Sequence, residues 1–98
     1  MELYAIRRKS GWAGPADLEQ AAAVSARIGD EEMPEDIRWI RSYVVHEDDG
    51  SLGTICIYEA SSPEKIREHA DRVGMPASEV HAIADTVVVR PDPAGAAA

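Results

Sequence analysis

Six segments with regular hydrophobic spacing follow one another along this chain, and their order restricts the fold more than any other feature of the sequence. Two of the segments have the spacing of helices, and the other four alternate or are continuously apolar, as strands are. We expect these segments at residues 3–7, 15–29, 36–46, 54–60, 61–74 and 85–90, in the order strand, helix, strand, strand, helix, strand.

Cap and turn residues set the limits of several segments. The sequence at residues 61–64, Ser-Ser-Pro-Glu, is typical of a helix start at Ser61 or Ser62, and Ser61 and Glu64 fit a capping box. Asp49-Gly50 is a hairpin signal between two predicted strands. We expect one further helical turn at residues 77–82, before the last predicted strand.

The order of the segments is that of the ferredoxin-like fold, β-α-β-β-α-β. Right-handed crossovers place both helices on one face of a four-stranded antiparallel sheet, with the first and third strands in the centre. A chain of 98 residues forms one hydrophobic core rather than two. We therefore expect a single α+β domain at residues 1–91 and a flexible tail at residues 92–98.

Apolar side chains are predicted on both faces of the sheet. In the third strand, Ile55 and Ile57 alternate with Cys56 and Tyr58. Two helices cover only one face of a sheet, and an apolar patch left on the other face usually marks an interface. We therefore expect a homodimer that packs through its sheet faces, and a monomer with an apolar outer face is the alternative.

Charge and composition argue against nucleic-acid and membrane partners. The net charge is −8, and Arg7-Arg8-Lys9, the only basic run, is interpreted as a solvated strand end. No apolar run reaches the roughly 20 residues that span a bilayer. The first residues lack the apolar stretch of a signal peptide. The single cysteine, Cys56, cannot form an internal disulfide, so we expect a cytoplasmic protein.

His69 is the residue on which a functional interpretation depends. Together with Ile66, Ala70 and Val73 it stands at the i, i+3, i+4 and i+7 positions of one helix face. This face carries the aliphatic residues of its helix and is expected to point at the core. A histidine there is either a hydrogen-bonded core residue or a ligand directed into a pocket, and the pattern leaves both possibilities open.

The first candidate site surrounds His69 with side chains of the sheet. If the hairpin loop has an even number of residues, Tyr43 pairs with Cys56. The same register pairs Arg41 with Tyr58, so that all four share a face. If this face lies under the helices, they form with His69 a half-polar cavity for an anionic or oxygenated small molecule. In the alternative they are core residues and paired charges, and a one-residue bulge would change the register.

The second candidate site has the donor types of a metal centre. Its predicted ligands are His69, Glu59 and Cys56, because imidazole together with carboxylate suits nickel or zinc. No two histidines stand at i and i+4 and no Cys-x-x-Cys is present, so the spacing alone does not identify a metal. We interpret His46 and His81 as solvated residues.

Three stretches of the chain resemble a family of small bacterial proteins described as nickel-binding-protein-like. They are residues 39–45 (WIRSYVV), 56–64 (CIYEASSPE) and 66–70 (IREHA). The resemblance covers residues 3–91 and implies a ferredoxin-like fold, a dimer and nickel binding. It assigns no ligand, so His69, Glu59 and Cys56 are chosen for their chemistry and placement.

Three functions are compatible with these observations. The leading hypothesis is a small cytoplasmic protein that binds a transition metal, nickel, for storage or sensing. The shape is also similar to the dimeric α+β barrel superfamily, which includes cofactor-free monooxygenases, haem-degrading enzymes and small cyclases. That similarity implies an enzyme for a small aromatic or polyketide-like molecule, with His69 as acid or base and Arg41, Tyr43 or Tyr58 as ligand-binding residues. The third possibility is an interaction module in which His69 is satisfied by backbone.

Overall fold

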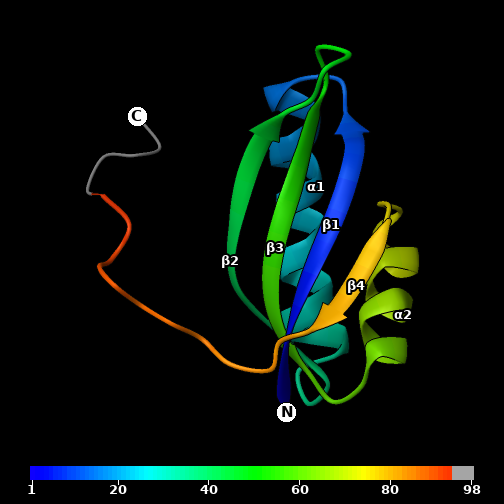
Figure 1. Cartoon of the computed structure of the whole chain (residues 1–98). Helices are drawn as coiled ribbons and strands as arrows, with labels where there is room; N and C mark the ends of the chain where they lie inside the picture. Colours follow the sequence, from blue (N-terminus) through cyan, green and yellow to red (C-terminus); the bar gives the residue numbers. More distant parts are fainter. Residues whose placement is uncertain (94–98) are drawn as a thin grey trace.

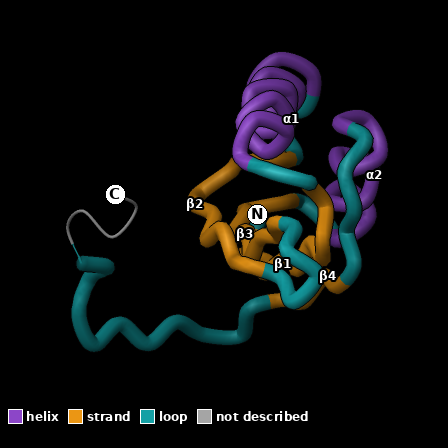
Figure 2. Tube along the Cα trace, turned by 90° about the horizontal axis from the view of Figure 1, so that it is seen from above, coloured by secondary structure: helices purple, strands orange, loops and turns teal. Residues whose placement is uncertain are grey.

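The computed structural model describes residues 1–93. Its elements are β1 (Glu2–Trp12), α1 (Pro15–Arg27), a π-helical turn η1 (Ile28–Glu32), β2 (Ile37–His46), β3 (Leu52–Ala60), α2 (Pro63–Val73) and β4 (Glu79–Ala82). The strands form one antiparallel sheet in the order β2-β3-β1-β4 (Figure 1). Both helices lie on one face of this sheet, α1 toward the β2 edge and α2 toward the β4 edge (Figure 2). This is the predicted ferredoxin-like arrangement.

The fourth strand lies earlier in the sequence than predicted. Residues 79–82, expected as a helical turn, pair with residues 4–7 of β1. Residues 85–90, expected as the strand, instead run as an extended chain away from the sheet, with Val88 72% exposed (Figure 1). Because α2 ends only a few residues before β4, the chain meets the edge of β1 as soon as it turns back. Chain proximity therefore outweighs the strand propensity of the later valines.

β1 is longer than predicted and carries Arg8 into the interior. Tyr4, Ile6 and Arg8 alternate along the strand on its helix-facing side, with exposures of 4%, 0% and 1%. The interpretation of Arg7-Arg8-Lys9 as a solvated strand end is therefore wrong for Arg8. Its guanidinium lies under the helices.

A bulge in β2 changes the predicted register. The pairs on either side of it are Trp39 with Tyr58, Arg41 with Ile57, Ser42 with Cys56 and Tyr43 with Ile55. Ile40 is the extra residue in β2. The residues that follow it therefore point to the opposite face of the sheet from the one predicted. The predicted pairing of Tyr43 with Cys56 and of Arg41 with Tyr58 is therefore wrong. Arg41 and Tyr43 lie on the outer face of the sheet, away from the helices.

The core fills the space between the two helices and the inner face of the sheet. It consists of Tyr4, Ile6, Ile28, Met33, Ile37, Cys56, Tyr58, Ala60 and Ile66. On α2, the residues buried are Ile66, His69 and Ala70, which confirms the predicted apolar face. The helical spacing therefore identifies how α2 packs.

α2 begins after Ser62, one of the two predicted start residues, and not after Ser61 of the capping box. The Ser62 hydroxyl accepts a hydrogen bond from the backbone N–H of Lys65 at 3.3 Å and is the N-cap. Ser61 instead donates to Asp36 at 2.7 Å and ties the helix start to the chain before β2. The helix ends at Gly74, whose φ of 84° is the left-handed conformation that glycine favours.

None of the described helices is long and apolar enough to cross a membrane. Most of the predicted tail at residues 92–98 lies outside the described residues. Asp92 belongs to the described part and accepts a hydrogen bond from the Tyr43 hydroxyl at 2.9 Å.

Candidate functional site

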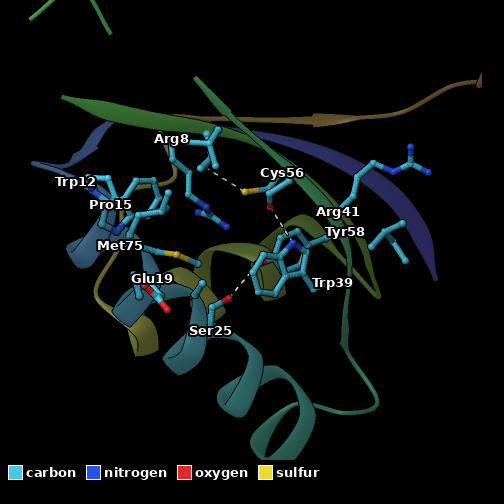
Figure 3. A pocket seen from close by; sticks show the side chains of 17 residues that line it. Arg8, Trp12, Pro15, Glu19, Ser25, Trp39, Arg41, Cys56, Tyr58 and Met75 are labelled. Atoms are coloured by element: carbon cyan, nitrogen blue, oxygen red, sulfur yellow. Dashed lines mark hydrogen bonds between the residues drawn. The ribbon is translucent and has the colours of Figure 1, made fainter. Parts of the chain in front are cut away.

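A cavity of about 530 Å³ lies between α1 and the inner face of the sheet (Figure 3). This volume is within the range of about 300–1,000 Å³ that is usual for small-molecule sites. Both tryptophans of the chain contribute to its mostly apolar wall. The lining residues are Arg8, Trp12, Pro15, Leu18, Glu19, Ala21, Ala22, Ser25, Trp39, Ile40, Arg41, Ser42, Val44, Thr54, Cys56, Tyr58 and Met75.

Two stacked aromatic rings form one wall of the cavity. The bulge places Trp39 opposite Tyr58, and the ring centroids are 6.0 Å apart with planes 7° from parallel. The indole N–H of Trp39 donates to the Ser42 hydroxyl at 2.8 Å. The Tyr58 hydroxyl lies 3.0 Å from the hydroxyl of Ser25 on α1, and burial raises the pKa of Tyr58. The tyrosine is therefore a neutral, hydrogen-bonded part of a rigid wall.

Arg8 is the buried charged group of this cavity. It reaches from β1 toward the interior (Figure 3) and is 1% exposed. Its Nη1 donates to the Pro76 carbonyl at 2.7 Å, and its Cζ lies 5.8 Å from the centroid of the Tyr58 ring. Nε and Nη2 have no hydrogen-bond partner among the described residues. Arg8 was not predicted as a site residue, although its alternation with Tyr4 and Ile6 indicates the inner face.

His69 lies behind the aromatic wall and does not line the cavity. Its Nε2 is 3.1 Å from the Ser25 carbonyl oxygen, and its ring is tilted against Tyr58 with centroids 5.5 Å apart. Burial lowers the pKa of His69, and the nearby charges of Arg8 and Arg72 lower it further. The neutral imidazole thus donates its Nε2–H to α1. This is the arrangement of a hydrogen-bonded core histidine.

Of the three predicted ligand-binding residues, Tyr58 is the one whose side chain forms a cavity wall. Arg41 touches the rim, but its guanidinium points away from the cavity (Figure 3). Arg41 and Tyr43 are neighbours on the outer face, where the Arg41 guanidinium is 3.5 Å from the Tyr43 hydroxyl and 3.8 Å from Asp92. The bulge in β2 therefore removes two of the three from the predicted site.

The three predicted metal ligands are not brought together. Cys56 is buried on the inner face, where its thiol donates to the Thr54 hydroxyl at 3.2 Å. Glu59 alternates with it onto the outer face and lies 3.5 Å from Arg38. His69 is enclosed between α1 and α2.

Residues 1–93 contain no group of three His, Cys, Asp or Glu side chains that could hold a metal ion. A two-donor arrangement is present on β4, where His81 Nε2 lies 2.9 Å from Glu79 Oε1 on an exposed surface. The described residues of one chain therefore do not form a complete transition-metal centre.

Comparison with known proteins gives the chain a family. Residues 4–83 match the family described as nickel responsive protein SCO4226-like. The chain belongs to this family. Its fold is also similar to the crystal structure of SCO4226 from Streptomyces coelicolor A3(2), with a TM-score of 0.66 and 20% sequence identity over 87% of this chain and 99% of that one. At this identity the likeness shows the fold alone. No curated protein matches the chain.

Proposed function

We propose that the protein binds a small molecule with an aromatic or apolar body in the cavity between α1 and the sheet. The observation that carries this proposal is the 530 Å³ cavity with its Trp39–Tyr58 wall. An apolar enclosure with a few converging polar groups, here Arg8 and the Tyr58 hydroxyl, is the usual pattern of a ligand site. Since His69 does not line this space, the proposal concerns binding and assigns no reaction.

Filling the cavity should abolish binding. Ala22 lines the cavity from α1, whereas Ala23, the next residue, is exposed and does not. We expect wild-type protein to bind the neutral probe 2-naphthamide, measured by calorimetry and by tryptophan emission, because Trp12 and Trp39 both line the cavity. Ala22→Phe should lose this binding, and the matched control Ala23→Phe should keep it. Absence of probe binding to wild type up to the solubility limit would contradict the proposal.

The family description favours a second function, nickel binding. We propose that Ni²⁺ binds on the exposed side of β4, where an imidazole and a carboxylate are already adjacent in His81 and Glu79. These donors suit nickel, and water or a second copy of the chain would supply the remaining ligands of the ion. Glu59 and Cys56, by contrast, lie on opposite faces of the sheet.

Single substitutions separate this nickel site from the one predicted at His69. In calorimetric titrations with Ni²⁺, His81→Ala should lower the affinity at least about tenfold, because it removes a direct ligand. His46→Ala is the control for a surface histidine, and His69→Leu should leave the affinity unchanged. Binding should weaken in acid because a protonated imidazole cannot coordinate metal. Loss of binding in His69→Leu alone would instead support the ligand set predicted from the sequence.

We propose that the chain forms a homodimer through the outer face of the sheet. Tyr43 and Ile55 on this face are 41% and 38% exposed, and Ile57 lies beside them in the alternation of β3. Ile57→Glu should shift the dimer toward monomer because it would bury an unpaired carboxylate in the interface. Ala23→Glu adds the same charge on the exposed side of α1 and should not. Light scattering that gives the mass of one chain, 10.6 kDa, for wild type would refute the dimer.

A further inference from the structure

We infer that the ligand of the cavity carries a carboxylate, which Arg8 binds through two parallel hydrogen bonds. This inference rests on the proposed small-molecule site and specifies the chemical class of its ligand: an aromatic or apolar carboxylate. The observations that carry it are the burial of Arg8, the identity of its unpartnered atoms and the aromatic wall beside it.

The two free donors of Arg8 lie on one edge of its guanidinium group. Nη1 is already engaged by the Pro76 carbonyl at 2.7 Å, whereas Nε and Nη2 have no partner among the described residues. The N–H bonds of Nε and Nη2 point the same way in the guanidinium plane. This spacing matches the two oxygens of a carboxylate, which is the basis of bidentate arginine–carboxylate pairs.

No side chain within residues 1–93 neutralises the Arg8 charge. Arg8 forms no ion pair with a described acid, and Glu19, the one acid that lines the cavity, is not within ion-pair distance of it. A buried cation without a counterion is costly, and the Tyr58 ring at 5.8 Å compensates only in part. An anion bound in the cavity would supply the missing charge.

The surroundings of Arg8 select for a carboxylate with a flat, apolar body. The guanidinium stands beside the Tyr58 ring, which is stacked on Trp39, and Trp12 also lines the space. The net charge of the whole chain is −8, so its long-range field does not attract anions. Anion selectivity must therefore come from Arg8 itself, and the aromatic wall supplies the contact area.

The test compares two probes of the same shape, 2-naphthoate and the neutral 2-naphthamide, by calorimetry on the full chain. Wild type should bind the carboxylate roughly 10- to 100-fold more tightly than the amide, as charge-assisted hydrogen bonds predict. Arg8→Met should bind the two probes about equally. Arg8→Lys keeps the charge but loses the two parallel donors of the guanidinium group, so it should retain part of the preference for the carboxylate. Arg41→Met removes a charge at the rim and should leave the preference intact.

The outcomes separate this inference from the function on which it rests. Equal binding of both probes to wild type would refute the inference that the ligand carries a carboxylate, but it would still support the small-molecule site. Binding of neither probe would overturn the site itself. A preference that survives in Arg8→Met but disappears in Arg41→Met would assign the anion to the rim and refute Arg8 as the anchor. If Arg8→Met does not fold, the Arg8→Lys variant tests the inference. An unchanged preference of that variant for 2-naphthoate would also refute bidentate binding by the guanidinium group.

Discussion

Replacing His69 by alanine is expected to lower the free energy of unfolding by about 2–5 kcal/mol, the usual cost of truncating a large buried side chain. The imidazole is 1% exposed and fills the space between α1 and α2, against the ring of Tyr58. Alanine would leave a void there and remove the hydrogen bond to the Ser25 carbonyl. Urea denaturation of both proteins measures the difference.

Leucine at this position separates a core role from a functional role. It fills most of the volume but cannot donate to Ser25, whose carbonyl also accepts the backbone N–H of Ile28. The carbonyl therefore keeps one partner, and His69→Leu should cost less than about 2 kcal/mol. Binding of 2-naphthamide and of Ni²⁺ should survive in His69→Leu. A well-folded leucine variant that has lost either activity would restore His69 as a functional residue.

The same histidine should make stability depend on pH. Burial lowers the pKa of His69 in the folded protein, so between that pKa and the ordinary value of about 6.5 the unfolded chain binds a proton that the folded chain does not. Its contribution is therefore complete above about pH 6.5 and is lost as the pH falls below it. His69→Leu should remove this part of the pH dependence, and an unchanged profile would show that other groups cause it.

Local patterns predicted those parts of the fold that depend on spacing along one element. The order of the six segments led to the ferredoxin-like arrangement, and the spacing of Ile66, His69 and Ala70 predicted the buried face of α2. Tyr58, which the sequence placed beside a possible cavity, lines the cavity between α1 and the sheet. These predictions succeed because each residue's orientation follows from the period of its own helix or strand.

The predictions that failed depend on how two elements meet. The single extra residue at Ile40 exchanges the faces of β2, so Arg41 and Tyr43 point outward, and no residue type marks such a bulge. The position of β4 depends on where the chain after α2 first meets β1. Arg8 was predicted to be solvated because it is charged, although it alternates with Tyr4 and Ile6 along β1. A cation on an inner face contradicts the hydrophobic pattern, and such conflicts are concentrated at functional sites.

Gly53 is expected to be the most sensitive glycine within residues 1–93. It lies in β3 where the register with β1 shifts between Arg8 and Trp12, and an alanine Cβ there would stand 2.6 Å from the backbone oxygen of Arg8 and 2.7 Å from Nη1 of Arg7. The same Cβ would overlap the Glu47 carboxylate, which pairs with Arg7 at 2.7 Å. The two side chains could move, but the Arg8 oxygen belongs to a central strand and cannot shift without distorting the sheet.

Gly53→Ala should therefore lower the free energy of unfolding by about 3 kcal/mol, the upper part of the usual range for overpacking, with urea denaturation as the measurement. Gly14→Ala is the matched control, because a Cβ on Gly14 meets nothing within 4 Å. Its cost should stay within about 1 kcal/mol, since the weaker helix cap and the more restricted unfolded chain oppose each other. A backbone clash predicts that truncating Glu47 does not rescue the variant. If Glu47→Ala restores the stability of Gly53→Ala, the side chain and not the β1 backbone is the obstacle, and the two strands are less tightly packed at this point than the structure indicates.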